Sequence, residues 1–241
     1  MNNLDKFRYS FDDPSQLNIS LKKDPYEKAT IQKSDNINQL LSTSVRVTKE
    51  IFPNINSAID NVFKRLKIEN NLNFFVTANH FQTQATCSAM PLGDSAEIIL
   101  TSKLIELLNG EELESVIAHE VAHFNYKHTS VPYRKIINRF SYSQNVEEKI
   151  FVQNLKKWSI CKEISADLLS LQITKSYEST AKALIKFTTG IMNDVDDGTS
   201  NFNMISHLKL PKEIPANSSA LFDIPQSKDV SLHRLKSYPI S

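Results

Sequence analysis

Apolar residues recur three and four positions apart along most of the chain, and this periodicity predicts a largely helical domain. Between residues 35 and 69 the pattern stops at Pro53 and then resumes, which indicates two helices with a turn near that proline. The apolar residues in 133–160 are expected to pack in the core. The alternative is that they form an exposed face that binds a partner or a membrane surface. The other expected helices are one at 103–108 capped by Ser102, one that begins at Glu111, one or two within 133–160, and one at 158–174.

Three short runs between these helices have the character of β-strands. They lie at residues 73–78, 84–90 and 97–101, and Pro-Leu-Gly-Asp at 91–94 supplies turn residues for a hairpin between the last two. A free strand edge can pair with an extended peptide, and the residues on that edge would lie near Ala85–Ala89. The expected fold class is α+β, mostly helical, with a small mixed or antiparallel sheet that borders a cleft.

The composition narrows the possible functions. A chain of 241 residues, 40% of them hydrophobic, can bury one sizeable core. Its net charge of +1 gives no polybasic surface, so nucleic acid is not expected as a partner, and its four scattered glycines cannot form a nucleotide phosphate loop. No apolar run predicts a transmembrane segment or a signal peptide, so we expect a cytoplasmic protein. Cys87 and Cys161 form no CxxC pair and are expected to be reduced thiols, with a single disulfide between them as the alternative.

The first 33 residues differ from the rest of the chain. They are polar and aperiodic, and Pro14 and Pro25 interrupt any helix. We therefore expect a polar N-terminal extension at 1–33, followed by a single domain at 34–241. The extension could be a tail laid over the domain surface or an arm that covers the active-site cleft, and the sequence does not separate these two roles.

The segment 116–128, VIAHEVAHFNYKH, carries the H-E-x-x-H pattern at His119, Glu120 and His123. Positions four apart lie on one face of a helix, so the two imidazoles can bind one metal ion. Glu120 follows the first histidine and can reach a metal-bound water, which is the minimum arrangement for zinc-assisted amide hydrolysis. The alternative is a core helix that carries two histidines by chance.

A third metal ligand is expected elsewhere, because catalytic zinc usually takes three protein ligands and leaves one position for water. Glu163 and Asp167 lie four apart on the apolar helical segment 158–174, and buried carboxylates need partners such as a zinc ion and a ligating histidine. The alternative is an exposed face that carries these charges beside Lys162. The remaining histidine candidates are His80, His128, His207 and His233.

On these residues the chain resembles the M48 peptidases, the family of the heat-shock protease HtpX and the CAAX prenyl proteases, within the gluzincin clan. The resemblance rests on HEVAHFNYKH at 119–128, ELLNGEELESVIAHE at 106–120 and EISAD at 163–167. It covers about 102–190 and includes a later helix at 179–191. It implies a zincin-like fold and one Zn²⁺ per chain, held by His119, His123 and Glu163. Asp167 would then bond a ligand imidazole and fix its tautomer.

The resemblance also implies a reaction, the hydrolysis of peptide bonds in a peptide or protein substrate. Glu120 would be the general base on a zinc-bound water, and His233, Arg234 and Tyr238 are candidates for a donor to the oxyanion. Members of the HtpX type carry membrane helices, so this chain is closer to the small soluble members. Lys228-Asp229 stands where the family often has His-Pro.

A second class of function fits the same residues. The chain could be a latent or non-catalytic zinc-stabilised binding domain that is regulated by its N-terminal segment, with the metal site covered or closed by a fourth protein ligand. His128 lies five residues after His123, off the ligand face of the helix, and is therefore not expected to close the site.

Overall fold

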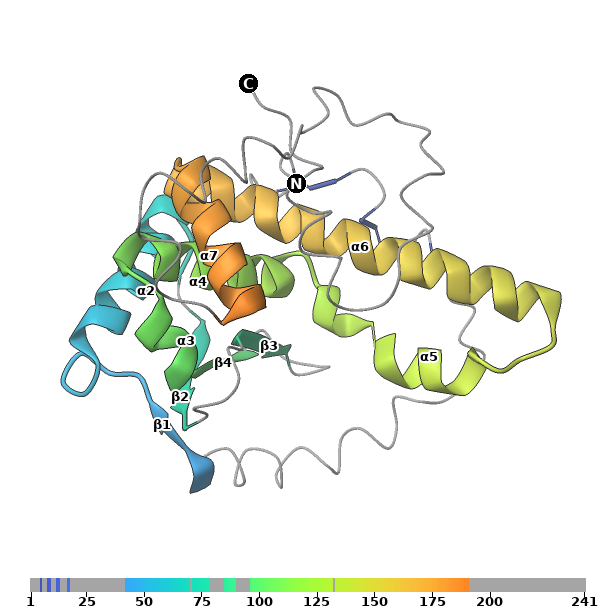
Figure 1. Cartoon of the computed structure of the whole chain (residues 1–241), viewed down its shortest axis with the longest axis horizontal. Helices are drawn as coiled ribbons and strands as arrows, with labels where there is room; N and C mark the ends of the chain where they lie inside the picture. The colour runs from blue at the N-terminus through green and yellow to red at the C-terminus, as the bar shows by residue number, and fades with distance from the viewer. Residues whose placement is uncertain are drawn as a thin grey trace.

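The computed structural model describes residues 42–69, 71–78, 85–89, 96–131 and 133–190, together with Asp5, Arg8, Tyr9, Asp12, Asp13 and Leu17; only the backbone is described at 85–89 and 188–189. Figure 1 shows a long helix, α6, that crosses the molecule, with the sheet gathered near one of its ends and α5 near the other. The elements are β1 (Ser44–Arg46), α2 (Pro53–Leu66), β2 (Leu72–Thr77), β3 (Ala85–Ala89), β4 (Ala96–Thr101), α3 (Ser102–Leu107), α4 (Gly110–Asn125), the 3-10 helix η4 (His128–Ser130), α5 (Tyr133–Phe140), α6 (Val146–Thr174) and α7 (Tyr177–Thr189).

The strands form one mixed sheet in the order β1-β2-β4-β3. β2 and β4 are parallel, with Phe74 opposite Ile98, and β3 is antiparallel to β4. This arrangement confirms the α+β class, the three expected strands and the hairpin pairing of β3 with β4, whereas the turn at 91–94 lies outside the described residues. β3 is an edge strand, as expected, and it packs beside α4.

The helix expected before Pro53 does not continue to the proline: Ser42 and Thr43 are helical, but the helix stops there. Ser44–Arg46 is instead a strand, β1, which pairs antiparallel with β2 and places Val45 opposite Val76. The edge of β2 stabilises it, because the amide of Val47 donates to Phe74 O at 2.8 Å and the Arg46 guanidinium donates to Asn73 Oδ1 at 2.7 Å. A sheet edge with free hydrogen-bonding groups thus outweighs the helical spacing of the apolar residues, and β-branched Val45 suits a strand.

The second helix expected between residues 35 and 69 is confirmed as α2. The expected turn near Pro53 lies at 49–51, and Pro53 is the first residue of α2. This position suits a proline because the first helical N–H has no partner within the helix. At α3, Thr101 rather than Ser102 is the N-cap, and its hydroxyl accepts from Leu104 N at 3.4 Å.

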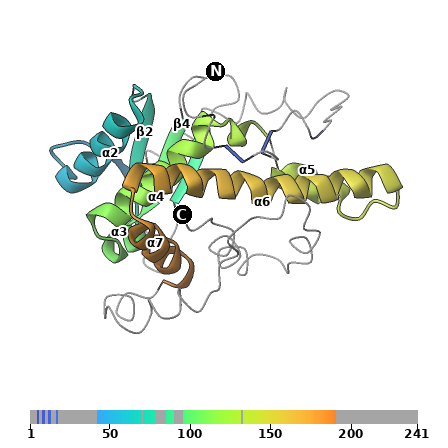
Figure 2. The same ribbon diagram turned by 90° about the horizontal axis from the view of Figure 1, so that it is seen from above.

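Helix α4 lies at the centre of the domain. It packs against α2, α6, α7 and β3, and its Ile117, Ala118, Val121 and Ala122 are fully buried in the main core. Seen from above, α6 runs over α4 (Figure 2). The rest of that core is formed by apolar side chains of α2, the sheet, α3 and α6, among them Val62, Ile98, Leu100, Leu104 and Leu169.

A second, smaller core holds α5 against the first half of α6. Ile136, Leu155 and Trp158 are buried there together with Val131, and Leu17 from the N-terminal segment packs with them. This packing confirms that the apolar positions of 133–160 mostly face the interior. None of the described helices, α6 with its 29 residues included, is long and apolar enough to cross a membrane.

Cys161 is a free thiol on α6, as expected, and burial raises its pKa to about 11. The side chain of Cys87 lies outside the described part of the structure.

The start of α4 is fixed by a capping box. The Asn109 side chain accepts from the amide of Glu112, and the Glu112 carboxylate accepts from the amide of Asn109, both at 2.9 Å. The same carboxylate is fully buried and forms an ion pair with Lys186 of α7, with 3.0 Å between Nζ and Oε2. This pair joins the helix that carries both histidines to the last described helix.

Replacement of Lys186 by methionine is expected to lower the free energy of unfolding by about 3–5 kcal/mol, because it removes one partner of a buried ion pair and leaves the Glu112 charge behind. Denaturant unfolding followed by circular dichroism measures this. The matched control is Lys182→Met, which breaks a partly exposed pair with Glu178 on the same helix and should change stability by less than ~1 kcal/mol. Equal effects of the two variants would contradict the expectation.

Candidate metal centre

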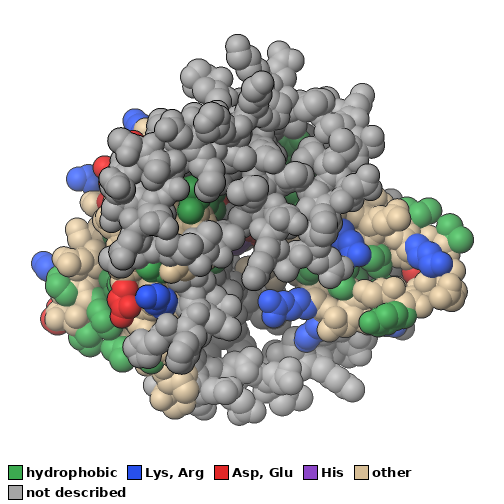
Figure 3. Space-filling model, viewed as in Figure 1, with side chains coloured by type: hydrophobic (Ala, Val, Ile, Leu, Met, Phe, Trp, Pro, Cys, Tyr) green, Lys and Arg blue, Asp and Glu red, His purple; other side chains and the backbone are tan. Residues whose placement is uncertain are grey.

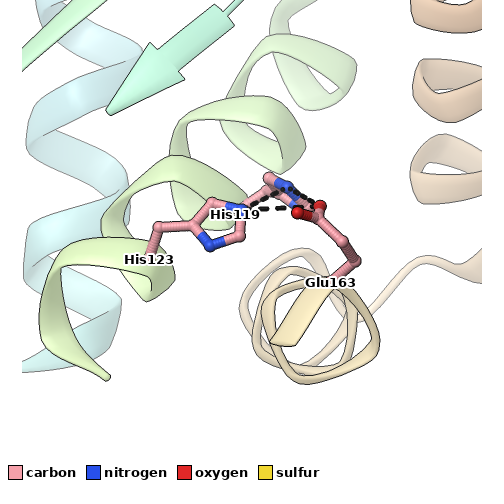
Figure 4. A group of neighbouring side chains, drawn as sticks. All are labelled: His119, His123 and Glu163. Atoms are coloured by element: carbon pink, nitrogen blue, oxygen red, sulfur yellow. Dashed lines mark hydrogen bonds and ion pairs between the residues drawn. The ribbon is translucent and has the colours of Figure 1, made fainter. Parts of the chain in front are cut away.

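Three potential metal ligands converge where α4 passes α6. His119 and His123 lie one turn apart on α4, and Glu163 approaches them from α6, so that two imidazoles and a carboxylate point toward one another (Figure 4). The two Nε2 atoms are 3.1 Å apart, and Glu163 Oε2 lies 3.4 Å from that of His119 and 3.5 Å from that of His123. Ligands about 2.0–2.1 Å from a tetrahedral zinc ion are about 3.3 Å from one another, so the three atoms match one face of such a tetrahedron.

The protons on these imidazoles lead to the same conclusion. His119 Nδ1 lies 2.8 Å from Oδ1 of Asp167, which is almost completely buried. An ionised carboxylate can only accept, so the ring proton of His119 is on Nδ1 and the lone pair of Nε2 points into the cluster. The lone pair of His119 Nε2 and the Glu163 carboxylate oxygen repel one another at these distances unless a metal cation, or a proton on His123 Nε2, lies between them. The chemistry of the three atoms, two nitrogens and one oxygen, suits zinc.

The surroundings keep His123 in its metal-binding form. Burial is the largest effect and lowers the pKa of His123, whereas the nearby Glu163 raises it by a smaller amount. Since neutral imidazole is the form that binds a metal, this environment favours the ligand state. Lys162 holds the other oxygen of Glu163, with 3.5 Å between Nζ and Oε1, which leaves Oε2 toward the histidines.

His128 lies behind His123 rather than among the ligands. The chain leaves α4 through Lys127, whose left-handed backbone (φ 59°) directs it into η4, which begins at His128. This turn brings His128 Nδ1 to 2.8 Å from His123 Nδ1, on the ring edge opposite the cluster. His128 Nε2 lies 2.8 Å from Oδ2 of Asp12, and burial lowers the pKa of His128 to about 4 although the Asp12 hydrogen bond opposes this.

A cavity of about 580 Å³ opens onto the cluster. His119, Glu120, His123 and Glu163 line it, so the glutamate of the H-E-x-x-H pattern borders the same space as the three potential ligands. One wall is apolar and comes from α4 and α7, with Val116, Ala183, Leu184 and Phe187. Other lining residues are basic, namely Arg134 and Lys135 of α5 and Lys162 of α6, and Figure 3 shows blue Lys and Arg side chains on the α5 side of the molecule.

The structure therefore brings together two groups of residues that are about 40 positions apart in the sequence. One group is His119, Glu120 and His123 on α4, and the other is Glu163 and Asp167 on α6. His233, Arg234 and Tyr238, the candidates for an oxyanion donor, lie outside the described residues, as do His80 and His207. Sequence reasoning gave no role to two buried residues behind the cluster. His128 could be noticed from its spacing after the pattern, but no local signal marks Asp12.

Replacement of Asp167 by alanine is expected to weaken zinc binding or activity by about 10–100-fold, because the His119 ring loses the partner that fixes its tautomer and orientation. Zinc affinity from chelator competition measures the effect. Asp60→Ala, at an exposed carboxylate on α2, is the matched control and should leave affinity unchanged. Wild-type affinity in Asp167→Ala would mean that this carboxylate does not support the site.

The comparisons with known proteins agree with the geometry. Residues 50–223 match the family described as Peptidase family M48, and this span includes both helices that carry the cluster. No curated protein and no solved structure matches the chain significantly. Because the match covers more than half of the 241 residues and contains every described residue of the cluster, the chain belongs to peptidase family M48.

Proposed function

We propose that this protein is a zinc-dependent metalloendopeptidase, with His119, His123 and Glu163 as the ligands of one Zn²⁺ and Glu120 as the general base. The observation that carries the proposal is the cluster itself, in which three acceptor atoms from α4 and α6 lie 3.1, 3.4 and 3.5 Å apart at the edge of a cavity. Two imidazoles and one carboxylate with an open position form the ligand set of catalytic rather than structural zinc sites.

The bound metal would polarise the scissile carbonyl and make a water molecule acidic enough to lose a proton near neutral pH. Glu120 follows His119 on α4 and borders the same cavity, so its carboxylate is placed to take that proton and then to donate it to the leaving amine. Asp167 holds the His119 ring through Nδ1, and Lys162 restrains one oxygen of Glu163. The burial of Asp167 and the packing of α4 against α6 keep these groups in place before a substrate binds.

The shape of the cavity favours a peptide or protein substrate. Its apolar wall on α7 can receive an apolar side chain, and the basic groups near α5 can pair with a carboxylate of the substrate. β3 is at the sheet edge and packs beside α4, so we propose that an extended peptide adds to this edge near Ala85–Ala89.

A non-catalytic or latent zinc domain is the competing function. It would need a fourth protein ligand or a segment that covers the cluster. Among the described residues, the potential ligand set contains His119, His123 and Glu163, and no described residue of the N-terminal segment lines the cavity. These observations favour an accessible site.

The test combines metal content with cleavage. The purified chain should contain about one zinc ion per molecule and should cleave an unfolded protein or a peptide library. A chelator should stop cleavage, and added zinc should restore it. Bound zinc without any chelator-sensitive cleavage would favour the binding domain, and a chain that binds no zinc would reject both functions.

A further inference from the structure

We propose that Asp12 is a positioning residue of the metal centre, which acts through His128 to hold the ligand His123 from behind. The inference rests on the proposed zinc site and adds to it a residue from the N-terminal segment. Asp12 lies 116 positions before His128 in the sequence, and yet the two side chains are in direct contact.

The contacts form a continuous chain of side chains. Oδ2 of Asp12 is 2.8 Å from His128 Nε2, and His128 Nδ1 is 2.8 Å from His123 Nδ1. Asp12 is completely buried, and His128 is 2% exposed. A carboxylate in such an environment needs hydrogen-bond donors, and the ring N–H of His128 is the closest one that the structure gives it.

Proton placement gives this chain a direction. When His123 binds the metal through the lone pair of Nε2, its single ring proton is on Nδ1 and is donated to Nδ1 of His128. The proton of His128 is then on Nε2 and is donated to Asp12. Because an ionised carboxylate can only accept, Asp12 selects the one tautomer of His128 that lets His123 present a lone pair to the metal.

Each of the two ligand histidines is therefore connected through its Nδ1 to a buried carboxylate. Asp167 of α6 bonds His119 directly, at 2.8 Å, whereas Asp12 supports His123 through one intervening imidazole. Each chain ends on a carboxylate that is at most 1% exposed. Histidines that bind metals commonly donate their second N–H to a carboxylate, and among the described residues Nδ1 of His123 reaches one through this relay.

The structure also holds Asp12 in place independently of His128. The amide of Tyr9 donates to Ser165 Oγ of α6 at 2.9 Å, and the amide of Asp12 donates to Tyr9 O at 2.9 Å. Arg8 pairs with Asp12 at 3.4 Å and donates to Tyr126 O, at the end of α4. The described residues of the N-terminal segment thus join the last turn of α4 to α6 behind the metal centre.

The experiment measures the zinc dissociation constant of the full chain by competition with a chelator of known affinity. Asp12→Ala is expected to raise this constant about 10–100-fold, as for other outer partners of metal ligands. Asp12→Asn should give a smaller rise, because an amide can still accept from His128 but can also donate and so no longer selects one tautomer. Asp13→Ala, at the neighbouring half-buried carboxylate, is the matched control and should bind zinc like the wild type.

A double-mutant cycle separates positioning from a general effect on folding. In the His128→Ala background, Asp12→Ala should have little further effect, because the chain to His123 is already interrupted. An equally large effect of Asp12→Ala in both backgrounds would overturn the inference. Denaturant unfolding of the metal-free variant gives its unfolded fraction. If that fraction alone accounts for the loss of zinc binding, the inference is also overturned.

The remaining outcomes are also distinct. A wild type that binds no zinc rejects the proposed function, whereas a wild type that binds zinc with the same affinity as Asp12→Ala overturns this inference alone. If the segment were an inhibitory arm, Asp12→Ala would leave the zinc affinity unchanged and raise the rate of peptide cleavage, which would also overturn the positioning role.

Discussion

Replacement of Glu120 by glutamine is expected to reduce peptide hydrolysis by about 10²–10⁴-fold, because a positioned general base contributes roughly that factor. Glutamine has nearly the shape of glutamate but cannot take a proton from the attacking water. Glu120 is not among the three potential metal ligands, so the variant should still contain zinc. The measurements are kcat/KM on a cleaved peptide and the zinc content of the same sample.

The matched control is Glu106→Gln, which makes the same change at an exposed position on α3 and should keep full activity. If Glu120→Gln kept its zinc and cleaved at the wild-type rate, another group would have to be the base. If it lost its zinc, the loss of activity would say nothing about proton transfer, and metal content is therefore measured in each sample.

Replacement of Glu163 by alanine is expected to weaken zinc binding by more than the ~10–100-fold that is typical of outer partners, because it removes one of the three proposed ligand atoms. Oε2 of Glu163 lies within 3.5 Å of both histidine Nε2 atoms. Each histidine is itself a proposed ligand and cannot also supply the third ligand atom. Without this carboxylate the charge of the site also becomes less favourable for a dication. Chelator competition gives the affinity, and activity should fall with zinc occupancy.

Glu147→Ala is the matched control for this variant, since Glu147 is an exposed glutamate in the first turn of the same helix. It should leave zinc affinity unchanged. An effect of Glu163→Ala no larger than that of Glu147→Ala would place the third ligand elsewhere. A large effect at Glu163 together with unchanged affinity in Glu147→Ala would support the assignment made from the geometry.

Local patterns predicted much of the fold because most elements depend on their own residues. The strands β2, β3 and β4 and the helices α2 and α4 lie close to where periodicity and turn residues placed them, and α7 lies close to the helix that the family resemblance implied. α6 covers the helix expected at 158–174 but begins at Val146, so it also includes the second half of the region 133–160. The exception is β1, where Ser44–Arg46 forms a strand although its neighbours have helical spacing. Three residues do not form a stable strand alone, and it is the open edge of β2 that stabilises them.

The same distinction holds for the candidate site. Because a helix repeats every 3.6 residues, the spacing of His119 and His123 places both rings on one face wherever the helix is packed. The spacing of Glu163 and Asp167 places both carboxylates on one face of α6 for the same reason. The pairing of each carboxylate with its histidine was an expectation from family resemblance, since spacing within one helix says nothing about its neighbour.

The sequence by itself determined which residues share a helix face, and hence that two imidazoles could meet one metal ion. Only the tertiary structure decided that Glu163 completes the cluster, that Asp167 supports His119, and that Asp12 reaches His128 from 116 positions away. The physical reason is that local spacing follows from backbone geometry, whereas contacts between distant segments depend on how the whole core packs. Asp12 has no pattern around it, and its role follows only from the burial and the distances that this packing creates.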